Sequence, residues 1–226
     1  KIIFFQNHLN NLLNSAKIYK IFKKNLNSKI KKIINMNLKK NKKYNHLLRI
    51  AVNKKLISIS IRNRVTPSKN FKLNLLNYKR NNPNHKNLKY KYILKNMNNI
   101  NSKFSDLALI CKNRIYETGT ANIIFIKNGK IYSPVNNFYK GITLKLIKKK
   151  FSIIHVDILL KNLNDFEEIL LVGSGKGIVS VNKVQGINWG RKSLKYYKIL
   201  NDYYEKAVTK CPIYYGWSIN LTILKI

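Results

Sequence analysis

Residues 111–143 read CKNRIYETGTANIIFIKNGKIYSPVNNFYKGIT, and the order of elements in this stretch decides the fold. A short strand ends in Glu117, and five residues later Asn122 opens an apolar strand. A turn at Asn128-Gly129 leads into another short strand, and Gly141-Ile142-Thr143 begins a helical pattern. We therefore predict strands over 114–117, 122–127 and 130–133, followed by a helix over about 141–150.

Similar patterns extend to both sides of this stretch. Apolar residues at helical spacing predict helices, and short apolar runs between turn signals predict strands. Helices are expected at 8–22, 28–38, 88–97 and 193–208, and strands at 47–52, 56–61, 107–111, 152–156, 168–172 and 177–184. Residues 64–85, which contain Pro67 and Pro83, are expected to be irregular. The pattern becomes strand-rich near residue 85, which predicts a smaller N-terminal lobe (1–85) and a larger C-terminal lobe (86–226).

The chain of 226 residues carries a formal net charge of +37, from 45 basic and 8 acidic residues. Such a charge is typical of nucleic-acid binding, because lysines neutralise phosphates. The lysines are spread along the chain, however, and they accompany abundant Asn, Ile, Tyr and Phe, which share AT-rich codons. We therefore attribute the charge to compositional drift and expect no dedicated nucleic-acid partner.

The sequence also bears on location. No apolar run approaches the roughly 18 residues of a membrane-spanning helix, so no membrane association is expected. Cys111 and Cys211 show no metal-type spacing, nor do the four histidines, so no metal site is expected. Two cysteines of this kind fit a reducing compartment, and we expect the cytoplasm or the equivalent stroma or matrix of an organelle or endosymbiont.

The pattern around Glu117, Asn122 and Gly141-Ile142-Thr143 resembles the core signature of the class IV, or fold-type IV, pyridoxal-phosphate enzymes. A second glycine turn, Gly173-Ser174-Gly175, follows an apolar strand and the acidic pair Glu167-Glu168, as in that family. The family comprises branched-chain and D-amino-acid aminotransferases and 4-amino-4-deoxychorismate lyase.

The resemblance implies an α/β fold, with an α+β N-terminal lobe and a C-terminal lobe built on a curved, barrel-like mixed sheet with helices. It also implies pyridoxal 5'-phosphate as the cofactor, an amino acid or oxo acid as the substrate, and a homodimer. The family normally has a further N-terminal hairpin, which we expect the smaller lobe to lack.

The candidate nucleophile is Lys86, which follows a proline-containing loop and precedes a predicted helix. A lysine fixed at the mouth of a pocket can form a Schiff base with an aldehyde cofactor and then act as general acid and base. Glu117 is one of only 8 acidic residues, and by the resemblance it pairs with the pyridine nitrogen and keeps it protonated. By the same resemblance, Asn122 and Tyr90 belong to the cofactor site.

A phosphate group is bound by backbone N–H groups at helix starts and turns, together with hydroxyls. Two segments match the phosphate loops of the family, one holding Ile142 and Thr143 and the other holding Ser174. The family usually has arginines at the position of Asn11 and directly after Gly-Ile-Thr, where this chain has Leu144. Neutral side chains cannot replace the bidentate charge of arginine, so these departures predict weaker cofactor binding.

Three functions are open from the sequence. The first is an aminotransferase that moves an amino group between a branched-chain or D-amino acid and a 2-oxo acid. The second is 4-amino-4-deoxychorismate lyase, which uses the same residues. The third is a family member without activity, which Asn11 and Leu144 favour and Lys86, Glu117 and Ser174 oppose.

Overall fold

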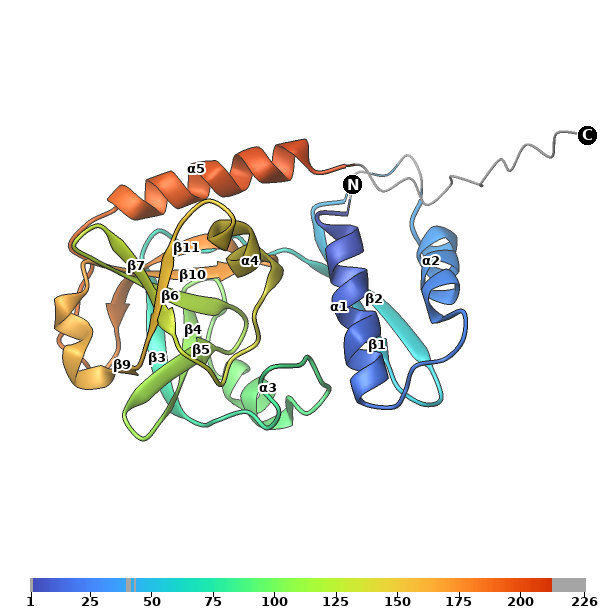
Figure 1. Ribbon diagram of the computed structural model, residues 1–226, viewed down its shortest axis with the longest axis horizontal. Coiled ribbons are helices and arrows are strands. Elements are labelled where there is room, and N and C mark those ends of the chain that lie inside the picture. Colours follow the sequence, from blue (N-terminus) through green and yellow to red (C-terminus); the bar gives the residue numbers. More distant parts are fainter. Residues whose placement is uncertain (1, 40–41, 43, 213–226) are drawn as a thin grey trace, which may run out of the picture. The chain divides into compact units, whose positions relative to one another are not determined.

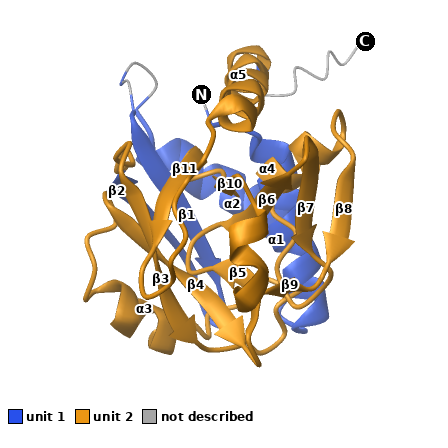
Figure 2. Cartoon of the chain, turned by 90° about the vertical axis from the view of Figure 1, so that its left-hand side faces the viewer, with its two compact units in different colours: residues 1–63, 211–226 blue, residues 64–210 orange. Residues whose placement is uncertain are grey.

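A computed structural model describes residues 2–39, 42 and 44–212 of the chain (Figure 1). The described residues form two compact units, one drawn from residues 1–63 and 211–226 and the other from residues 64–210 (Figure 2). The lobe boundary expected after residue 85 stays a prediction. Within the described part of the chain, no helix combines the length and the apolar character needed to cross a bilayer.

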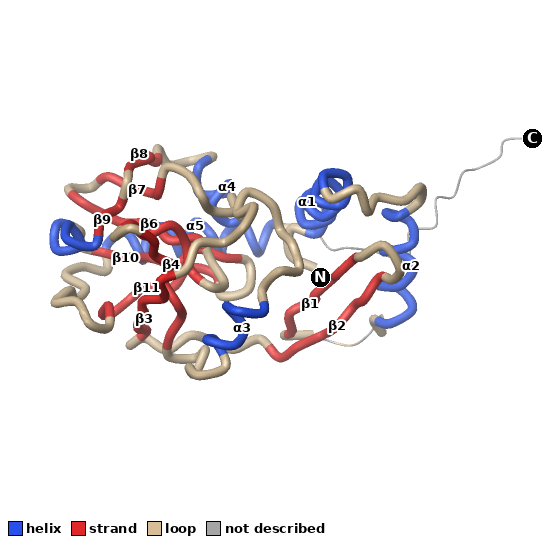
Figure 3. Tube along the Cα trace, turned by 90° about the horizontal axis from the view of Figure 1, so that it is seen from below, coloured by secondary structure: helices blue, strands red, loops and turns tan. Residues whose placement is uncertain are grey.

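The first unit combines two helices with a hairpin: α1 (Phe5–Ile18), α2 (Leu26–Asn37), β1 (His46–Val52) and β2 (Ile57–Asn63) (Figure 3). Leu26, Ile30 and Ile34 recur every four residues on α2, so they share one face and are almost fully buried. β1 and β2 pair antiparallel, with Leu48 opposite Ile61. The helices and the hairpin predicted for this region are confirmed.

The second unit is built on one large mixed sheet. Its strands, among the described residues, are β3 (Phe71–Asn77), β4 (Ser105–Cys111), β5 (Arg114–Thr118), β6 (Asn122–Lys127), β7 (Lys130–Pro134), β8 (Ile153–Val156), β9 (Ile158–Leu159), β10 (Glu168–Gly173) and β11 (Gly177–Val184). They lie in the order β8-β7-β6-β10-β11-β3-β4-β5-β9. β3 pairs parallel with β4 and β11, β7 pairs parallel with β8, and the other pairs are antiparallel.

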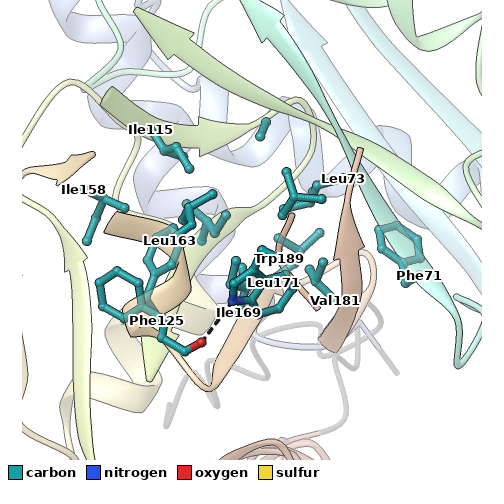
Figure 4. Close-up of a cluster of buried hydrophobic side chains, with 14 of the residues drawn as sticks. Phe71, Leu73, Ile115, Phe125, Ile158, Leu163, Ile169, Leu171, Val181 and Trp189 are labelled. Carbon is teal, nitrogen blue, oxygen red and sulfur yellow. Dashed lines mark hydrogen bonds between the residues drawn. The ribbon is translucent and has the colours of Figure 1, made fainter. Parts of the chain in front are cut away.

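The sheet is strongly curved. β5 contacts β6 and β7, although these strands are far apart in the strand order, so the sheet bends round to bring them together. An apolar cluster fills the space that the curved sheet encloses, and it includes Phe71, Leu73, Phe125 and Leu171 (Figure 4). Trp189 belongs to this cluster, and its Nε1 donates to a backbone carbonyl at 2.9 Å, which satisfies the indole N–H inside the core.

Helical segments complete the second unit: α3 (Lys91–Met97), α4 (Ile142–Lys148), the 3₁₀ helix η1 (Leu160–Asp165) and α5 (Lys195–Lys210). The first turn of α5 is held by Glu168, whose two carboxylate oxygens accept the backbone N–H groups of Tyr196 and Tyr197, each at 2.8 Å. Glu168 is buried at the start of β10. One residue of the acidic pair noted in the sequence therefore fixes the start of a helix.

The pairing of β10 with β6 brings two distant turns together. The strands are antiparallel, with Val172 opposite Asn122, so the turn after β10 lies beside the turn before β6. The two turns pack closely, because a Cβ added to Gly173 would lie 3.1 Å from the Cβ of Ala121. Two segments that are about 50 positions apart in sequence thus meet at one end of the paired strands.

The expectation that residues 64–85 are irregular is wrong for residues 71–77. These residues form β3, an interior strand with a parallel partner on each side. Phe71 and Leu73 are buried while Lys72 between them is exposed, so the strand has the alternation of a half-buried element. The expectation of irregular structure rested on Pro67 and Pro83, but both prolines lie outside the strand.

Candidate active site

Glu117 lies near the end of β5 and is buried, with 5% of its surface exposed. Its carboxylate pairs with Arg80, whose Nε donates to Oε1 at 2.5 Å and whose Nη2 donates to Oε2 at 2.8 Å. Burial raises the pKa of Glu117, and the adjacent guanidinium opposes that rise because its positive charge favours the carboxylate. The unit therefore holds a hydrogen-bonded carboxylate in its interior.

Arg80 also organises the loop that carries the predicted nucleophile. It stands three residues after β3, and its Nη1 donates to Tyr90 Oη at 3.1 Å. Its Nη2 donates in addition to the carbonyl of Pro83 at 3.0 Å. One buried guanidinium thus joins Glu117 to both sides of the loop between Arg80 and Tyr90.

Lys86 lies in that loop. The residue as a whole is exposed, but its Nζ lies 5.2 Å from the centroid of the Tyr139 ring. Loss of solvent around the ammonium lowers the pKa of Lys86, the positive charge of Arg80 lowers it further, and Glu117 raises it. An amine with a lowered pKa has a larger neutral fraction at neutral pH, which is the form that attacks an aldehyde.

Tyr139 contacts three of the predicted residues. Its ring lies beside Lys86, and its backbone N–H donates to Oε2 of Glu117 at 3.4 Å. Its carbonyl accepts a hydrogen bond from Nδ2 of Asn122 at 2.5 Å. The chain segment before α4 therefore connects the lysine, the glutamate and the asparagine.

Asn122 holds the entry to α4 through a second hydrogen bond. Its Oδ1 accepts the backbone N–H of Gly141 at 2.9 Å, so both ends of the side-chain amide bind the main chain. Gly141 precedes α4 directly, and a Cβ added to it would lie only 2.7 Å from that Oδ1. Cofactor binding by Asn122 stays a prediction, and its observed contacts position the segment that leads to Ile142 and Thr143.

Thr143 and Ser174 bring the two predicted phosphate segments together. Thr143 lies in the first turn of α4, and Ser174 lies in the turn between β10 and β11. Their hydroxyl oxygens are 3.4 Å apart. Ile142 begins α4 with a buried side chain, and the expected role of its backbone amide stays a prediction.

The residues proposed from the sequence form one continuous set of contacts within the second unit. Arg80 links Glu117 to Tyr90, Tyr139 links Glu117 to Lys86 and Asn122, and Gly141 leads from Asn122 into α4. Lys86 and Ser174 are 88 positions apart in the sequence. The fold therefore gathers these residues at one end of the strands.

Arg80 is a residue of this site that the sequence motifs do not indicate. It is one of six arginines among 45 basic residues, and it lies only six positions before Lys86. An arginine in so lysine-rich a chain is a compositional signal, because a bidentate fork cannot be replaced by lysine. That signal could have marked Arg80 as the partner of a buried carboxylate.

The two positions where an arginine was expected also differ in their surroundings. Leu144 is buried on α4, with 4% of its surface exposed, so it contributes to the apolar core. Asn11 lies on α1, in the other unit. Beside Leu144, Lys145 is exposed on α4.

A sequence model of the family described as amino-transferase class IV matches residues 1–184. The chain belongs to the class IV aminotransferase family. The predicted family and the predicted fold class are therefore confirmed, and so is the expectation of an enzyme of this class. A search of the curated proteins finds no match.

Several solved structures have the same fold. A candidate 4-amino-4-deoxychorismate lyase of Legionella pneumophila is 20% identical, with a TM-score of 0.71 over 91% of this chain and 86% of that one. A branched-chain aminotransferase of Thermoproteus uzoniensis with norvaline is 14% identical, with a TM-score of 0.71 over 92% and 80% of the two chains. A candidate branched-chain amino acid aminotransferase of Thermotoga maritima is 15% identical, with a TM-score of 0.69 over 91% and 80%.

Proposed function

We propose that this member of the class IV family is a pyridoxal-phosphate-dependent aminotransferase that moves an amino group between an amino acid, of the branched-chain or D-amino-acid type, and a 2-oxo acid. One observation carries the proposal. The ammonium of Lys86 and the buried carboxylate of Glu117 belong to a single set of contacts, which Tyr139 and Arg80 connect. Such a pair of titratable groups with shifted pKa values is typical of catalytic sites.

The donor set fits pyridoxal 5'-phosphate in each of its parts. Lys86 supplies an amine with a lowered pKa for the aldehyde, and Glu117 supplies a buried carboxylate for the pyridine nitrogen. Thr143 and Ser174 supply two adjacent hydroxyls for the phosphate. Each oxygen of Glu117 has more than one acceptor position, so its pairing with Arg80 leaves capacity for a further donor. When bound, the cofactor supplies an electron sink for cleavage of bonds at the substrate Cα.

Lys86 has two tasks in this proposal. Its neutral amine would bind the cofactor covalently at the aldehyde carbon, with release of water, and so hold it in place between reactions. Once a substrate amine had taken its place, the free Nζ would act as the base that accepts the proton of the substrate Cα and as the acid that returns it. The positive charge of Arg80 and the removal of solvent both favour the neutral amine that these steps need.

Glu117 and its partners maintain the charge distribution. The carboxylate would keep the ring nitrogen protonated, and Arg80 favours the ionised carboxylate and fixes its direction. Asn122 holds the backbone of Tyr139 and Gly141, which sets the start of α4. Thr143 and Ser174 would donate hydrogen bonds from their hydroxyls to the phosphate. Because Leu144 stands where the family has an arginine, the phosphate-binding part of the site lacks that charge. We therefore expect lower cofactor affinity than in a family member with the arginine.

The lyase function is the second candidate. It is supported by the fold similarity to the candidate 4-amino-4-deoxychorismate lyase of Legionella pneumophila, at 20% identity. The residues described above serve both reactions, so the substrate decides between them.

We also propose a homodimer, as the family resemblance implies, and a cytoplasmic location or its organellar equivalent.

The test uses purified protein loaded with pyridoxal 5'-phosphate. Wild type should develop the absorbance of a protein-bound cofactor, and borohydride should attach the pyridoxyl group to Lys86, as read by peptide mass spectrometry. Lys86→Ala should lose both signals, whereas Lys89→Ala, a change in the same loop, should keep them. Attachment at another lysine in Lys86→Ala would refute the assignment. Amino-group transfer to 2-oxo acids and pyruvate release from aminodeoxychorismate then distinguish the two activities, and absence of both would favour a member without activity.

A further inference from the structure

Asp106 is a buried carboxylate that the proposed mechanism does not use. It lies on β4 with no exposed surface, and its Oδ2 accepts hydrogen bonds from three side chains. Thr118 donates through Oγ1 at 3.1 Å, Thr120 donates through Oγ1, and Lys176 donates through Nζ at 3.0 Å. Its Oδ1 accepts the backbone N–H of Leu107 at 2.8 Å. A buried carboxylate with this many donors is fixed in place.

These donors come from two different segments. Thr118 ends β5, directly after Glu117, and Thr120 lies in the turn between β5 and β6. Lys176 belongs to the turn between β10 and β11, two residues after Ser174. Asp106 therefore ties the turn that follows the proposed ring-binding carboxylate to the turn that carries a proposed phosphate-binding hydroxyl.

The side chain of Lys176 is largely buried. Its side chain is 12% exposed, and its Nζ also lies 4.8 Å from the centroid of the Phe71 ring. In the same turn, the carbonyl of Gly175 accepts a hydrogen bond from Arg64 Nε at 3.1 Å. The turn is thus held at Gly175 by Arg64 and at Lys176 by Asp106, and Ser174 directly precedes these two residues.

We infer that Asp106 and Lys176 form a positioning pair, which sets the Ser174 turn in the conformation that accepts a phosphate monoester. This inference rests on the proposed function, because the ligand in question is the phosphate of pyridoxal 5'-phosphate. The pair acts through Ser174. Asp106 neutralises the charge of Lys176, so Lys176 itself does not replace the arginine that the family has at the position of Leu144.

The alternative is that Lys176 leaves Asp106 and binds the phosphate directly. The two possibilities predict opposite results for Asp106→Asn. If the pair positions the turn, removing the carboxylate loosens the turn and weakens phosphate binding. If Lys176 binds phosphate directly, removing its competing anion strengthens phosphate binding.

The experiment compares pyridoxal 5'-phosphate with pyridoxal, which has the same aldehyde but no phosphate, by equilibrium titration. In Lys176→Met and Asp106→Asn, we expect Kd for the phosphorylated aldehyde to rise about tenfold and Kd for pyridoxal to change by about twofold or less, since a hydrogen bond to a charged group has this order of strength. Lys176→Arg should retain wild-type discrimination. The matched control is Lys127→Met, because Lys127 forms an exposed ion pair of the same 3.0 Å length with Asp165, and it should leave both Kd values unchanged.

A second measurement decides the inference without any cofactor. Hydrogen exchange of the backbone amides at residues 174–176 should be faster in Lys176→Met than in wild type or Lys127→Met. Equal loss of affinity for both aldehydes, tighter phosphate binding in Asp106→Asn, or unchanged exchange in the turn would each overturn the inference. If wild type binds neither aldehyde, the proposed function fails, and the exchange result alone decides whether the pair fixes the turn.

Discussion

The guanidinium of Arg80 and the carboxylate of Glu117 share two hydrogen bonds, although 37 positions separate them in the sequence. Arg80 follows an interior strand, and Glu117 lies on the strand two places further along the sheet. The side chains of both are almost fully buried, with 6% and 7% of their surfaces exposed. Each charge therefore depends on the other for its compensation inside the protein.

The first prediction concerns this pair. Arg80→Met should lower the free energy of unfolding by about 3–5 kcal/mol, because it leaves a buried carboxylate without its partner. The double variant Arg80→Met/Glu117→Gln should be less destabilised than the sum of the two single variants. Chemical denaturation followed by circular dichroism measures all three.

The control for the first prediction is an exposed ion pair of the same unit. Arg114 and Asp157 are 3.0 Å apart, with 47% and 48% of their side chains exposed. Arg114→Met should cost about 0–1 kcal/mol, because water screens an exposed pair. Equal costs for Arg80→Met and Arg114→Met would show that the buried pair contributes nothing beyond a surface ion pair.

The second prediction concerns the protonation of Lys86. Its pKa is below the ordinary lysine value of 10.5, so its amine should become reactive at lower pH than that of a free lysine side chain. Because Arg80 lowers this pKa and Glu117 raises it, Arg80→Met should move the reactivity midpoint upward and Glu117→Gln should move it downward. Labelling of lysines at a series of pH values, read by mass spectrometry, gives the midpoint for Lys86.

The lowered pKa also gives the sign of the effect on stability. The folded protein disfavours the charged form of Lys86, so the unfolded chain binds more protons at pH values between the two pKa values. The contribution of this residue to stability should therefore increase as pH rises from the folded pKa toward 10.5. In the labelling experiment, a shift of the Lys86 midpoint in the same direction in Arg80→Met and in Glu117→Gln would contradict the opposite effects assigned to Arg80 and Glu117.

The parts of the fold that were predictable are those with dense apolar runs. The run Ile123–Ile126 on β6 is buried without interruption, and the sequence therefore identifies the strand at once. The spacing also places Glu117 near the end of β5 and Asn122 at the start of β6, because the turn between two strands fixes the distance from one to the other. β3 has the alternation of a half-buried strand, but it lies between Pro67 and Pro83, and these breakers led to the expectation of an irregular segment.

The parts of the site that were not predictable depend on main-chain atoms. Asn122 binds the carbonyl of Tyr139 and the N–H of Gly141, and no side-chain pattern encodes such partners. The N–H of Tyr139 on Glu117 is of the same kind. Residue type can identify a candidate asparagine, but the tertiary fold decides whether it faces a cofactor or holds a loop.

The third prediction concerns the start of α5. Glu168→Gln keeps the size of the side chain but leaves only one carbonyl oxygen for the two backbone N–H groups of Tyr196 and Tyr197. Because the site is buried, we expect a loss of about 1–3 kcal/mol in the free energy of unfolding. Glu167→Gln is the control, since the carboxylate of Glu167 accepts an exposed hydrogen bond from the backbone N–H of Asn128. Equal stability of the two variants in thermal denaturation would show that the hydrogen bonds of Glu168 to the start of α5 do not stabilise the protein.

The fourth prediction concerns the space between Gly141 and Asn122. The φ of Gly141 is −67°, which any residue adopts, so alanine at this position is opposed by steric contact and not by backbone strain. A Cβ at Gly141 would lie 2.7 Å from Oδ1 of Asn122, and Gly141→Ala should therefore cost about 1–3 kcal/mol and weaken cofactor binding by displacing the start of α4.

A double-variant cycle separates this contact from other effects. Asn122→Ala removes the obstructing oxygen together with its hydrogen bonds to Tyr139 and Gly141, so it should destabilise the protein by itself. In that background Gly141→Ala should cost almost nothing further, because the added methyl group enters the vacated space. Unfolding of the four proteins in denaturant measures the coupling. Additive costs would mean that Asn122 does not define the room available to Gly141, and that α4 is positioned by other contacts.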